Sequence, residues 1–344
     1  MRFKRELAAA LAIIAAIAGA GFASGREIVA FFSGAGWASW PGIAVACASL
    51  GLFTAMLARL AQRGRAASLA GIYASAMSRE CGDAVALLHS LAMLLTTSVM
   101  LAAAGELGAL AIGLRLACPL AIVAALGMGL LLSSRGFQRL RLLGALLAPC
   151  LFLFYLALAL DPSPAPQAFY TAPAYSVSGN AIAAVLLGAL YASLNAAMSG
   201  GVLAEVCQDG ISPKRLGWLT GGLLLLLLVP ANAAMLRGGS AVRELALPSV
   251  VLAARWGSFG FYLTIAVMWL CVVTTLGAAL GSIRGMAVEK GLNARLALTC
   301  AILASLLLGA VGFPALVQIG YPLLGWVCAL CLLALIPFLG EEAP

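Results

Sequence analysis

The sequence has very little charge. Only 9% of its 344 residues are Asp, Glu, Lys or Arg, whereas 64% are hydrophobic, and the mean hydropathy is +1.09. A chain with so few polar side chains cannot cover its surface in water, which excludes soluble enzymes, secreted disulfide scaffolds and disordered proteins. The composition therefore predicts a single-domain integral membrane protein that crosses the bilayer many times.

Residues that commonly carry catalysis or bind metals are also scarce. The chain has one histidine, His89, and it contains neither an H-E-x-x-H nor a G-x-S-x-G motif. Its nine cysteines are scattered mostly through apolar runs, which favours packing over a disulfide framework. These absences argue against an enzyme, and we expect no cofactor. The net charge of +8 lies in short loops, as a topology signal, so we expect no nucleic acid partner.

Ten apolar runs of spanning length predict an all-α membrane protein of ten helices. The single domain, 1–344, divides into a first half over about 6–160, a polar, Pro-rich extracellular loop over 161–179, and a second half over about 180–339. The segment 237–256 is too charged to span and is expected to be a short surface helix in a long loop. The ten predicted helices cover 6–33, 38–61, 82–113, 116–134, 137–160, 180–207, 213–236, 257–287, 294–312 and 314–339.

Lysine and arginine are distributed unequally among the predicted loops. If successive loops alternate between the two sides of the membrane, 15 of the 20 Lys and Arg residues lie on the side of the N-terminus and only four lie on the other side. Loops rich in Lys and Arg stay in the cytoplasm. We therefore predict that both termini are cytoplasmic and that lipid surrounds the protein. The sequence does not specify an oligomeric state.

Small and polar residues interrupt the first helix of each half, at 19–25 and at 193–201. The centres, Gly21 and Asn195, lie about half a chain length apart. Five helices per half means that the second half crosses the membrane in the opposite sense, as in the inverted repeats of secondary transporters, where matching interruptions are typical of a midplane binding site. The alternative for Gly21-x-x-x-Gly25 is a packing face of small residues.

A broken helix frees backbone groups that lipid cannot satisfy. The N–H groups after the first break, at the positive end of the helix dipole, would stabilise a substrate carboxylate. We expect these residues to bind a small-molecule substrate together with polar side chains of the third and sixth helices. The predicted substrate-binding residues are Gly19, Ala20, Gly21, Phe22, Ala23, Ser24, Gly25, Thr96, Thr97, Tyr191, Ser193 and Asn195.

Other charged residues fall within the predicted spans. Arg26 and Glu27 of the first helix and Glu106 of the third are predicted to form an external gate, with a static ion pair as the alternative. His89 either carries protons or is a hydrogen-bonded structural residue. Glu205 lies near the inner end of the sixth helix, in solvent or beside a basic residue.

The run Gly19-Ala-Gly-Phe-Ala-Ser-Gly-Arg-Glu-Ile28, followed by Phe31-Phe32, resembles the first-helix signature of the YkvI-type family of bacterial membrane proteins. That family is related to the amino acid–polyamine–organocation (APC) transporters. The length of the chain and its predicted helix count also fit this family, so the resemblance covers essentially the whole chain. Only the first-helix motif is specific to the family. The resemblance implies a LeuT-type fold in the bacterial cytoplasmic (inner) membrane. It also implies transport of small organic solutes, among which amino acids are the commonest substrates.

The resemblance also implies a coupling ion. Sodium-coupled relatives use two carbonyls before the first break, and one carbonyl and two hydroxyls of the eighth helix, which here correspond to Ala15, Ala18, Cys271, Thr274 and Thr275. The alternative is that the threonines bond only their own helix. Proton-driven relatives can place a Lys of the fifth helix near this position, and this fifth helix has none. Metal transporters of this fold use an Asp in the first break, where this chain has no acid before its Arg-Glu pair.

The sequence thus predicts a sodium-coupled secondary transporter with alternating access, whose substrate is an amino acid or a related carboxylate. A proton-coupled transporter or exchanger, working through Glu27, Glu106 or His89, is the alternative within the same fold. A membrane sensor or assembly subunit that transports nothing is the alternative of a different class.

Overall fold

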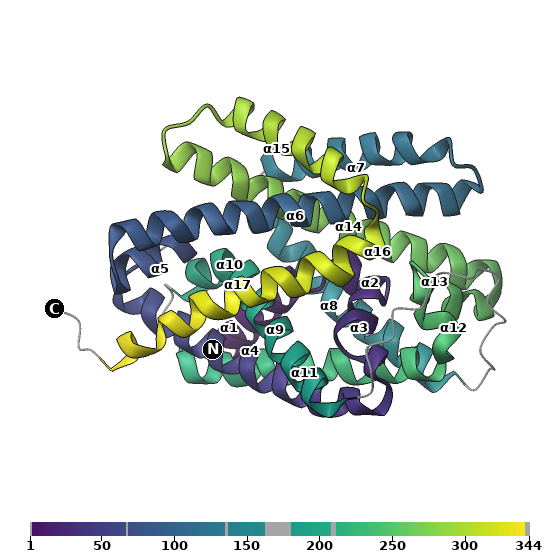
Figure 1. The fold of residues 1–344 in the computed structure, drawn as a ribbon, viewed down its shortest axis with the longest axis horizontal. Coiled ribbons are helices and arrows are strands. Elements are labelled where there is room, and N and C mark those ends of the chain that lie inside the picture. Colours follow the sequence, from purple (N-terminus) through teal and green to yellow (C-terminus); the bar gives the residue numbers. More distant parts are fainter. Residues whose placement is uncertain (1, 67, 135–136, 162–179, 208–210, 341–344) are drawn as a thin grey trace.

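The computed structural model describes residues 2–66, 68–134, 137–161, 180–207 and 211–340, and every regular element in these ranges is helical. Seven of the described helices are long and apolar enough to cross a membrane, and two shorter apolar helices lie at Leu146–Leu160 and Ala294–Gly309. In Figure 1 most of the longer helices run roughly along the long axis of the molecule. The protein is an all-helical membrane bundle, and the count of ten spans stays a prediction.

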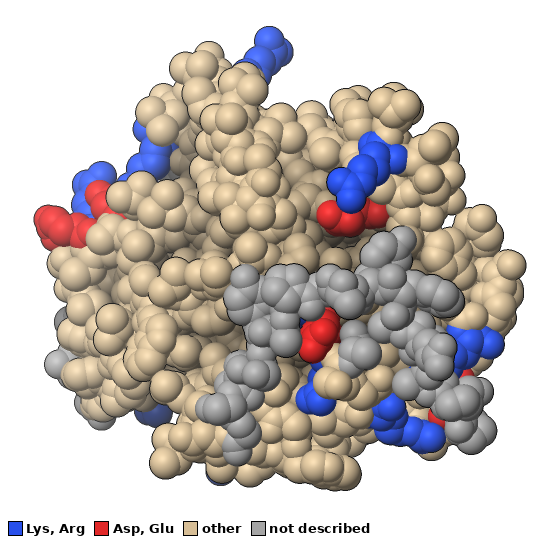
Figure 2. Space-filling model, turned by 45° about the vertical axis from the view of Figure 1, so that its right-hand side comes forward, with Lys and Arg blue, Asp and Glu red and all other residues tan. Residues whose placement is uncertain are grey.

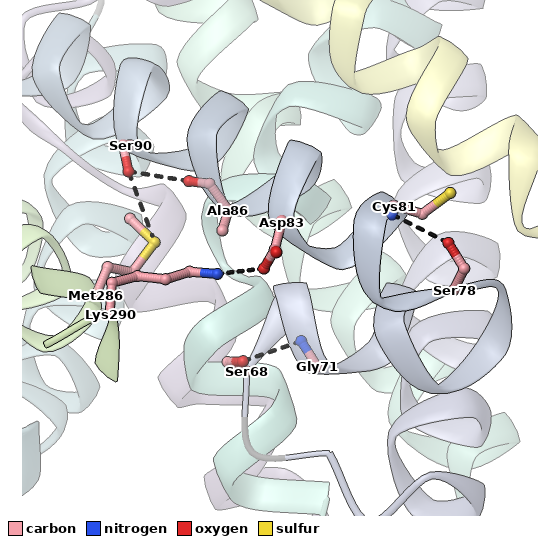
Figure 3. A network of polar contacts seen from close by, with 9 residues as sticks. All are labelled: Ser68, Gly71, Ser78, Cys81, Asp83, Ala86, Ser90, Met286 and Lys290. Carbon is pink, nitrogen blue, oxygen red and sulfur yellow. Dashed lines mark hydrogen bonds and ion pairs between the residues drawn. The ribbon is translucent and has the colours of Figure 1, made fainter. Parts of the chain in front are cut away.

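The helices of the first half follow the predicted apolar runs closely. They are α4 (Ser39–Arg63), α6 (Arg79–Ile112), α7 (Ala117–Ser134) and α8 (Phe137–Leu160). The prediction lacked one short helix, α5 (Leu69–Ala76), before α6. The Ser68 and Ser78 hydroxyls accept hydrogen bonds from the first turns of α5 and α6, which explains where both helices begin (Figure 3).

The second half also matches the predicted runs, with short interruptions. The helix α14 ends at Glu289, close to the predicted boundary, and the last predicted span is divided into four short elements. Of the predicted extracellular loop, 162–179 lie outside the described residues. The elements are α9 (Ala181–Met198), α10 (Gly200–Val206), α11 (Pro213–Arg237), α14 (Gly257–Glu289), α15 (Ala294–Gly309), α16 (Phe313–Ala315), η4 (Leu316–Gly320), α17 (Tyr321–Ala334) and η5 (Ile336–Leu339).

The segment predicted as a surface helix is partly built into the protein. It forms α12 (Gly239–Arg243), α13 (Pro248–Ala253) and the short turn η3 (Ala254–Trp256). The expectation of a surface position is wrong for α13, where five of six residues are buried. The charges that prevent this segment from spanning lie before and after α13, so the helix itself is free to pack inward.

The first predicted helix is broken twice. The helix α1 (Arg2–Ile17) ends before Gly19, α2 covers Ala20–Ala23, α3 covers Arg26–Phe31, and the 3-10 helix η1 (Ser33–Ala38) follows. Gly25 has φ +79°, a conformation that favours glycine. The Ser24 hydroxyl donates to the Gly21 carbonyl at 2.9 Å and accepts from the Arg26 N–H at 3.1 Å, which holds the turn between α2 and α3. The predicted interruption is confirmed.

The interruption of the sixth predicted helix is narrower than expected and lies about one turn later. Only Ser199 separates α9 from α10, and Ser193 and Asn195 are helical. Their side chains bond carbonyls of the preceding turn: Ser193 Oγ donates to Ala189 O and Asn195 Nδ2 to Tyr191 O, both at 2.9 Å. Polar side chains bonded in this way do not break a helix.

Glycines allow α4 to cross its neighbours closely. A Cβ atom on Gly42 would lie 2.4 Å from the Ala184 carbonyl oxygen of α9, and one on Gly188 would lie 2.1 Å from the Gly42 carbonyl oxygen. On α11, a Cβ on Gly217 would lie 2.4 Å from the Gly51 carbonyl oxygen. Backbones in such contact require small residues, as is usual where membrane helices pack together.

Polar contacts join helix ends that the distribution of Lys and Arg places in the cytoplasm. Glu6, near the start of α1, forms an ion pair of 3.7 Å with Arg215, near the start of α11. Asp83, near the start of α6, pairs with Lys290 at the end of α14 (Figure 3). Arg63, which ends α4, donates to carbonyls of η5. All these ends belong to loops predicted to be inside.

A second set of contacts joins ends predicted to be outside. The Arg237 Nη1 donates to the Ala159 carbonyl at 2.6 Å, and the Trp256 Nε1 donates to the Asp161 carboxylate at 3.0 Å. None of these contacts joins a predicted inner loop to a predicted outer one. Figure 2 shows the charged side chains in small separate groups, with broad uncharged surface between them, as suits a protein that faces lipid.

Candidate functional site

A buried carboxylate lies between the first and sixth predicted helices. Glu27 of α3 is 3% exposed, and its side chain folds back over α2, where a Cβ on Gly21 would lie 2.8 Å from Oε2. The Asn195 side chain of α9 lies within hydrogen-bonding reach of this carboxylate. The structure therefore brings together three predicted site residues, and Glu27 faces the first break.

Tyrosines from three helices lie within electrostatic range of Glu27. Tyr155 of α8, Tyr191 of α9 and Tyr321 of α17 are buried and lie close enough to interact electrostatically with its carboxylate. The Tyr191 hydroxyl is fully buried and has no hydrogen-bond partner among the described residues. The Tyr191 ring packs edge-on against Phe31 and Phe32, with centroid distances of 5.2 and 5.1 Å. The setting combines one acid, hydroxyl groups and aromatic rings.

The carbonyls freed by the break are satisfied by residues that the sequence analysis missed. Tyr155 Oη donates to the Phe22 carbonyl at 2.5 Å and to the Ala23 carbonyl at 3.0 Å. Ser249 of α13 donates its hydroxyl to Ala23 O at 2.7 Å and its N–H to Ser24 O at 2.9 Å. Buried carbonyls need such partners. The only sequence feature that could have pointed to this role of Tyr155 is its single hydroxyl group within an otherwise apolar helix.

The structure brings the first break, at Gly19, against α14, which carries three of the predicted sodium ligands. A Cβ on Gly19 would lie 3.2 Å from Thr275 Oγ1. The Gly19 N–H donates to Ile17 O, so it is not available for the usual helical bond to Ala15 O. The Thr274 hydroxyl donates to carbonyls of its own helix, Leu270 O at 2.8 Å and Cys271 O at 3.1 Å. Cys271 is buried, as is Ala18 at the break.

The predicted residues of the third helix are buried on α6. Thr96 and Thr97 donate their hydroxyls to Ala92 O and Met93 O of their own helix, both at 2.8 Å. The Thr96 hydroxyl also lies 4.0 Å from the Met198 sulfur, at the end of α9. Thr96 therefore faces the second break.

The three predicted gate residues do not meet in the described part of the chain. Arg26 is buried, and its Nη1 donates to the Arg243 carbonyl at 2.8 Å and the Leu245 carbonyl at 3.2 Å. Glu106 is exposed on α6 and pairs with neither Arg26 nor Glu27. Arg26 instead ties α3 to the segment between α12 and α13.

The remaining predicted polar residues are His89 and Glu205. His89 Nε2 lies 3.1 Å from Ser282 Oγ of α14, so His89 is hydrogen-bonded. A small cavity of about 30 Å³ lies beside it and is also lined by Cys328 and Cys331. The Glu205 side chain lies outside the described part of the structure.

A larger hollow lies at the predicted cytoplasmic end. Its volume is about 690 Å³, and it lies between α5, α6, α14 and the start of α15. The Asp83–Lys290 ion pair and the contact of Ser90 Oγ with Met286 Sδ, 3.7 Å, link α6 to α14 along it (Figure 3). None of its lining residues belongs to either helix break, so this hollow is separate from the Glu27 site.

Comparisons with known proteins agree with this architecture. No family model matches the chain. It is 25% identical over 334 residues to the uncharacterized membrane protein YkvI of Bacillus subtilis, covering 92% of this chain and 91% of that protein. It also resembles the structure of Mhp1, a nucleobase-cation-symport-1 family transporter in a closed conformation with bromovinylhydantoin bound. The TM-score is 0.56 at 17% identity, over 93% of this chain and 74% of Mhp1.

A mutant of the Eremococcus coleocola manganese transporter matches equally well, with a TM-score of 0.56 at 16% identity, over 97% of this chain and 86% of that one. Identities this low show the fold alone. Both solved proteins are transporters rather than enzymes. The chain is therefore a membrane protein that is homologous to YkvI and has the LeuT-like fold of these transporters.

Proposed function

We propose that this protein is a secondary active transporter that carries a small organic solute across the bacterial cytoplasmic membrane by alternating access, built from two inverted repeats of five helices. The buried Glu27, which lies against the first break and within reach of Asn195 of α9, is the observation that carries the proposal. A buried ionisable group between discontinuous helices marks the substrate or ion pathway of membrane proteins.

An amino acid or a related carboxylate remains the expected substrate class. Two features support a small, charged solute: the interrupted helical backbone between Gly19 and Gly25, and the carboxylate of Glu27 beside it. An amino acid has one group of each charge and so has a partner for both features.

Sodium is the first candidate for the coupling ion, at Ala15, Ala18, Cys271, Thr274 and Thr275. The contact between Gly19 and Thr275 and the release of the Ala15 carbonyl from the Gly19 N–H support it. A hydroxyl that donates its proton to a helix carbonyl keeps lone pairs for a cation, so the Thr274 bonds are compatible with this role.

Proton coupling is the second candidate, and the burial of Glu27 without a cationic partner in the described residues favours it. An isolated carboxylate in a water-poor site readily takes up a proton. Glu106 and His89 are weaker candidates for this role, because Glu106 is exposed and His89 is hydrogen-bonded to Ser282.

Reconstitution in liposomes tests the function. We expect labelled amino acids to accumulate in proteoliposomes when an inward sodium gradient is imposed, and not in protein-free liposomes. Accumulation driven by a pH gradient without sodium would identify proton coupling instead. The absence of both uptake and exchange for a broad panel of amino acids, amines and carboxylates would contradict the proposed function.

A further inference from the structure

The Glu27 carboxylate has no cationic partner among the described residues. The neighbouring Arg26 directs its guanidinium to the Arg243 and Leu245 carbonyls, and the described ion pairs involve other acids. A buried carboxylate without a counter-ion is costly, so it is stable only when it binds a proton or when a cation comes from outside the chain.

The surroundings of Glu27 match an ammonium group. The carboxylate and the unpartnered Tyr191 hydroxyl are both buried, and the oxygens of both can accept N–H hydrogen bonds. The Tyr191 ring packs with Phe31 and Phe32, and Phe22 meets Tyr155 edge-on with a centroid distance of 5.6 Å. Aromatic faces attract ammonium cations, and the attraction is strongest where water is excluded.

The same geometry disfavours an isolated anion. A Cβ on Gly21 would lie 2.8 Å from Glu27 Oε2, so a substrate carboxylate at the Gly21 backbone would meet the carboxylate of the protein itself. Two like charges at such a distance repel strongly where water is scarce. The backbone N–H groups of the first break are therefore poor partners for a solute whose only charge is negative.

We propose that Glu27 binds the ammonium group of the transported solute, so that the central site selects amines, amino acids included, over carboxylates that lack an amino group. This inference rests on the proposed function and names its substrate class. Because a protonated Glu27 cannot pair with an ammonium, amine binding weakens as the pH falls. The other polar groups within electrostatic range of Glu27 are Tyr155 of α8, Tyr191 and Asn195 of α9 and Tyr321 of α17.

Two probes of the same chain length and opposite charge, n-butylammonium and n-butyrate, test the inference on the purified full-length protein. We expect n-butylammonium to raise the apparent melting temperature by about 2 °C at about ten times its dissociation constant, and n-butyrate to have no effect. The Glu27→Gln variant should lose the response. Glu106→Gln, at an exposed acid, should keep it. The response of the wild type should shrink at mildly acidic pH.

An equal response to n-butyrate, no response to n-butylammonium, or an unchanged response in Glu27→Gln would overturn the inference. A second measurement covers the case in which that variant does not fold. Dicyclohexylcarbodiimide modifies protonated carboxyl groups in apolar sites, and n-butylammonium should slow the modification of Glu27 in the wild type, as followed by peptide mass spectrometry. An unchanged rate would also overturn the inference. Neither assay requires transport, so amine binding without any uptake in liposomes would refute the proposed function alone.

Discussion

Glycine 21 has no room for a side chain because the Glu27 carboxylate lies against it. We predict that Gly21→Ala weakens substrate binding about tenfold, equivalent to about 1.4 kcal/mol, because the added methyl group displaces the carboxylate. The loss of stability should stay within about 1 kcal/mol, since the displaced atom ends a flexible side chain. Transport kinetics and thermal unfolding measure the two effects separately.

The control for this change is Gly222→Ala in α11, where an added Cβ would meet nothing within 4 Å. This variant should bind substrate as the wild type does. If Gly21→Ala also binds substrate with wild-type affinity, the present position of the Glu27 carboxylate is not needed for substrate binding.

Tyr155 supports the first break from a distant part of the chain. Its hydroxyl donates to both Phe22 O and Ala23 O, so Tyr155→Phe leaves buried carbonyls with fewer partners. We predict a loss of about 1–3 kcal/mol in the free energy of unfolding. Tyr262→Phe, at a side chain that is 58% exposed, is the control and should leave the melting temperature unchanged. Equal melting temperatures for both variants would contradict this role.

Single residues differ in how far the sequence could predict them. The small residues from Gly19 to Gly25 break the helix through their local conformation, so the sequence pattern alone was enough to predict the break. The roles of Tyr155, Ser249 and Tyr321 depend on which helices pack around the break, and no local pattern contains that information. The gate stays a prediction: Arg26, Glu27 and Glu106 are not paired in this conformation, because closeness in membrane depth does not fix the direction of a side chain.

At the scale of helices, the crossing of α4 and α9 depends on Gly188. A Cβ there would lie 2.1 Å from the Gly42 carbonyl oxygen, so the helices would have to separate. We predict that Gly188→Ala destabilises the protein by about 1–3 kcal/mol, measured by thermal or denaturant unfolding. Gly127→Ala in α7, where nothing lies within 4 Å, should instead be neutral or stabilising by up to about 1 kcal/mol. The prediction fails if the two variants unfold alike.

The proposed sodium site belongs to the contact between α14 and the first break. Thr275 Oγ1 lies beside Gly19, so Thr275→Val, which keeps the shape and removes the oxygen, should abolish the sodium dependence of uptake. Thr264→Val removes a hydroxyl that donates to Gly260 O in the same helix, and it should retain sodium dependence. Sodium-dependent uptake that survives in Thr275→Val would show that the coupling sodium does not bind at this contact.

Whole helices were predicted well where the signal was the length of an apolar run, as for α8, whose bounds agree with the predicted range. The second break was displaced because Ser193 and Asn195 bond their own helix, so polarity alone did not mark a break. The inward position of α13 was missed because its flanking charges resemble those of a surface segment. Its burial depends on a partner, the first break, that lies far away in the sequence.

At the scale of the whole molecule, the polar contacts pair the loop ends into two sets. Glu6 with Arg215 and Asp83 with Lys290 join ends of one set, whereas Arg237 with Ala159 joins ends of the other. The distribution of Lys and Arg among the loops had placed the helix ends of each set on the same side of the membrane. Agreement between packing and charge supports the alternation of the helices, but the contacts are the same whichever set faces the cytoplasm. Orientation therefore needs a chemical test.

The three lysines of the chain, Lys4, Lys214 and Lys290, are exposed and belong to the set predicted to be cytoplasmic. A membrane-impermeant amine reagent should therefore modify none of them in intact spheroplasts and should modify them after permeabilisation, as read by peptide mass spectrometry. The Arg115→Lys variant places an amine in the exposed turn between α6 and α7, predicted to be outside, and should be modified in intact spheroplasts. Because α1 and α11 are joined through Glu6, modification of Lys214 in intact spheroplasts would contradict the predicted orientation of the whole bundle and place both termini outside.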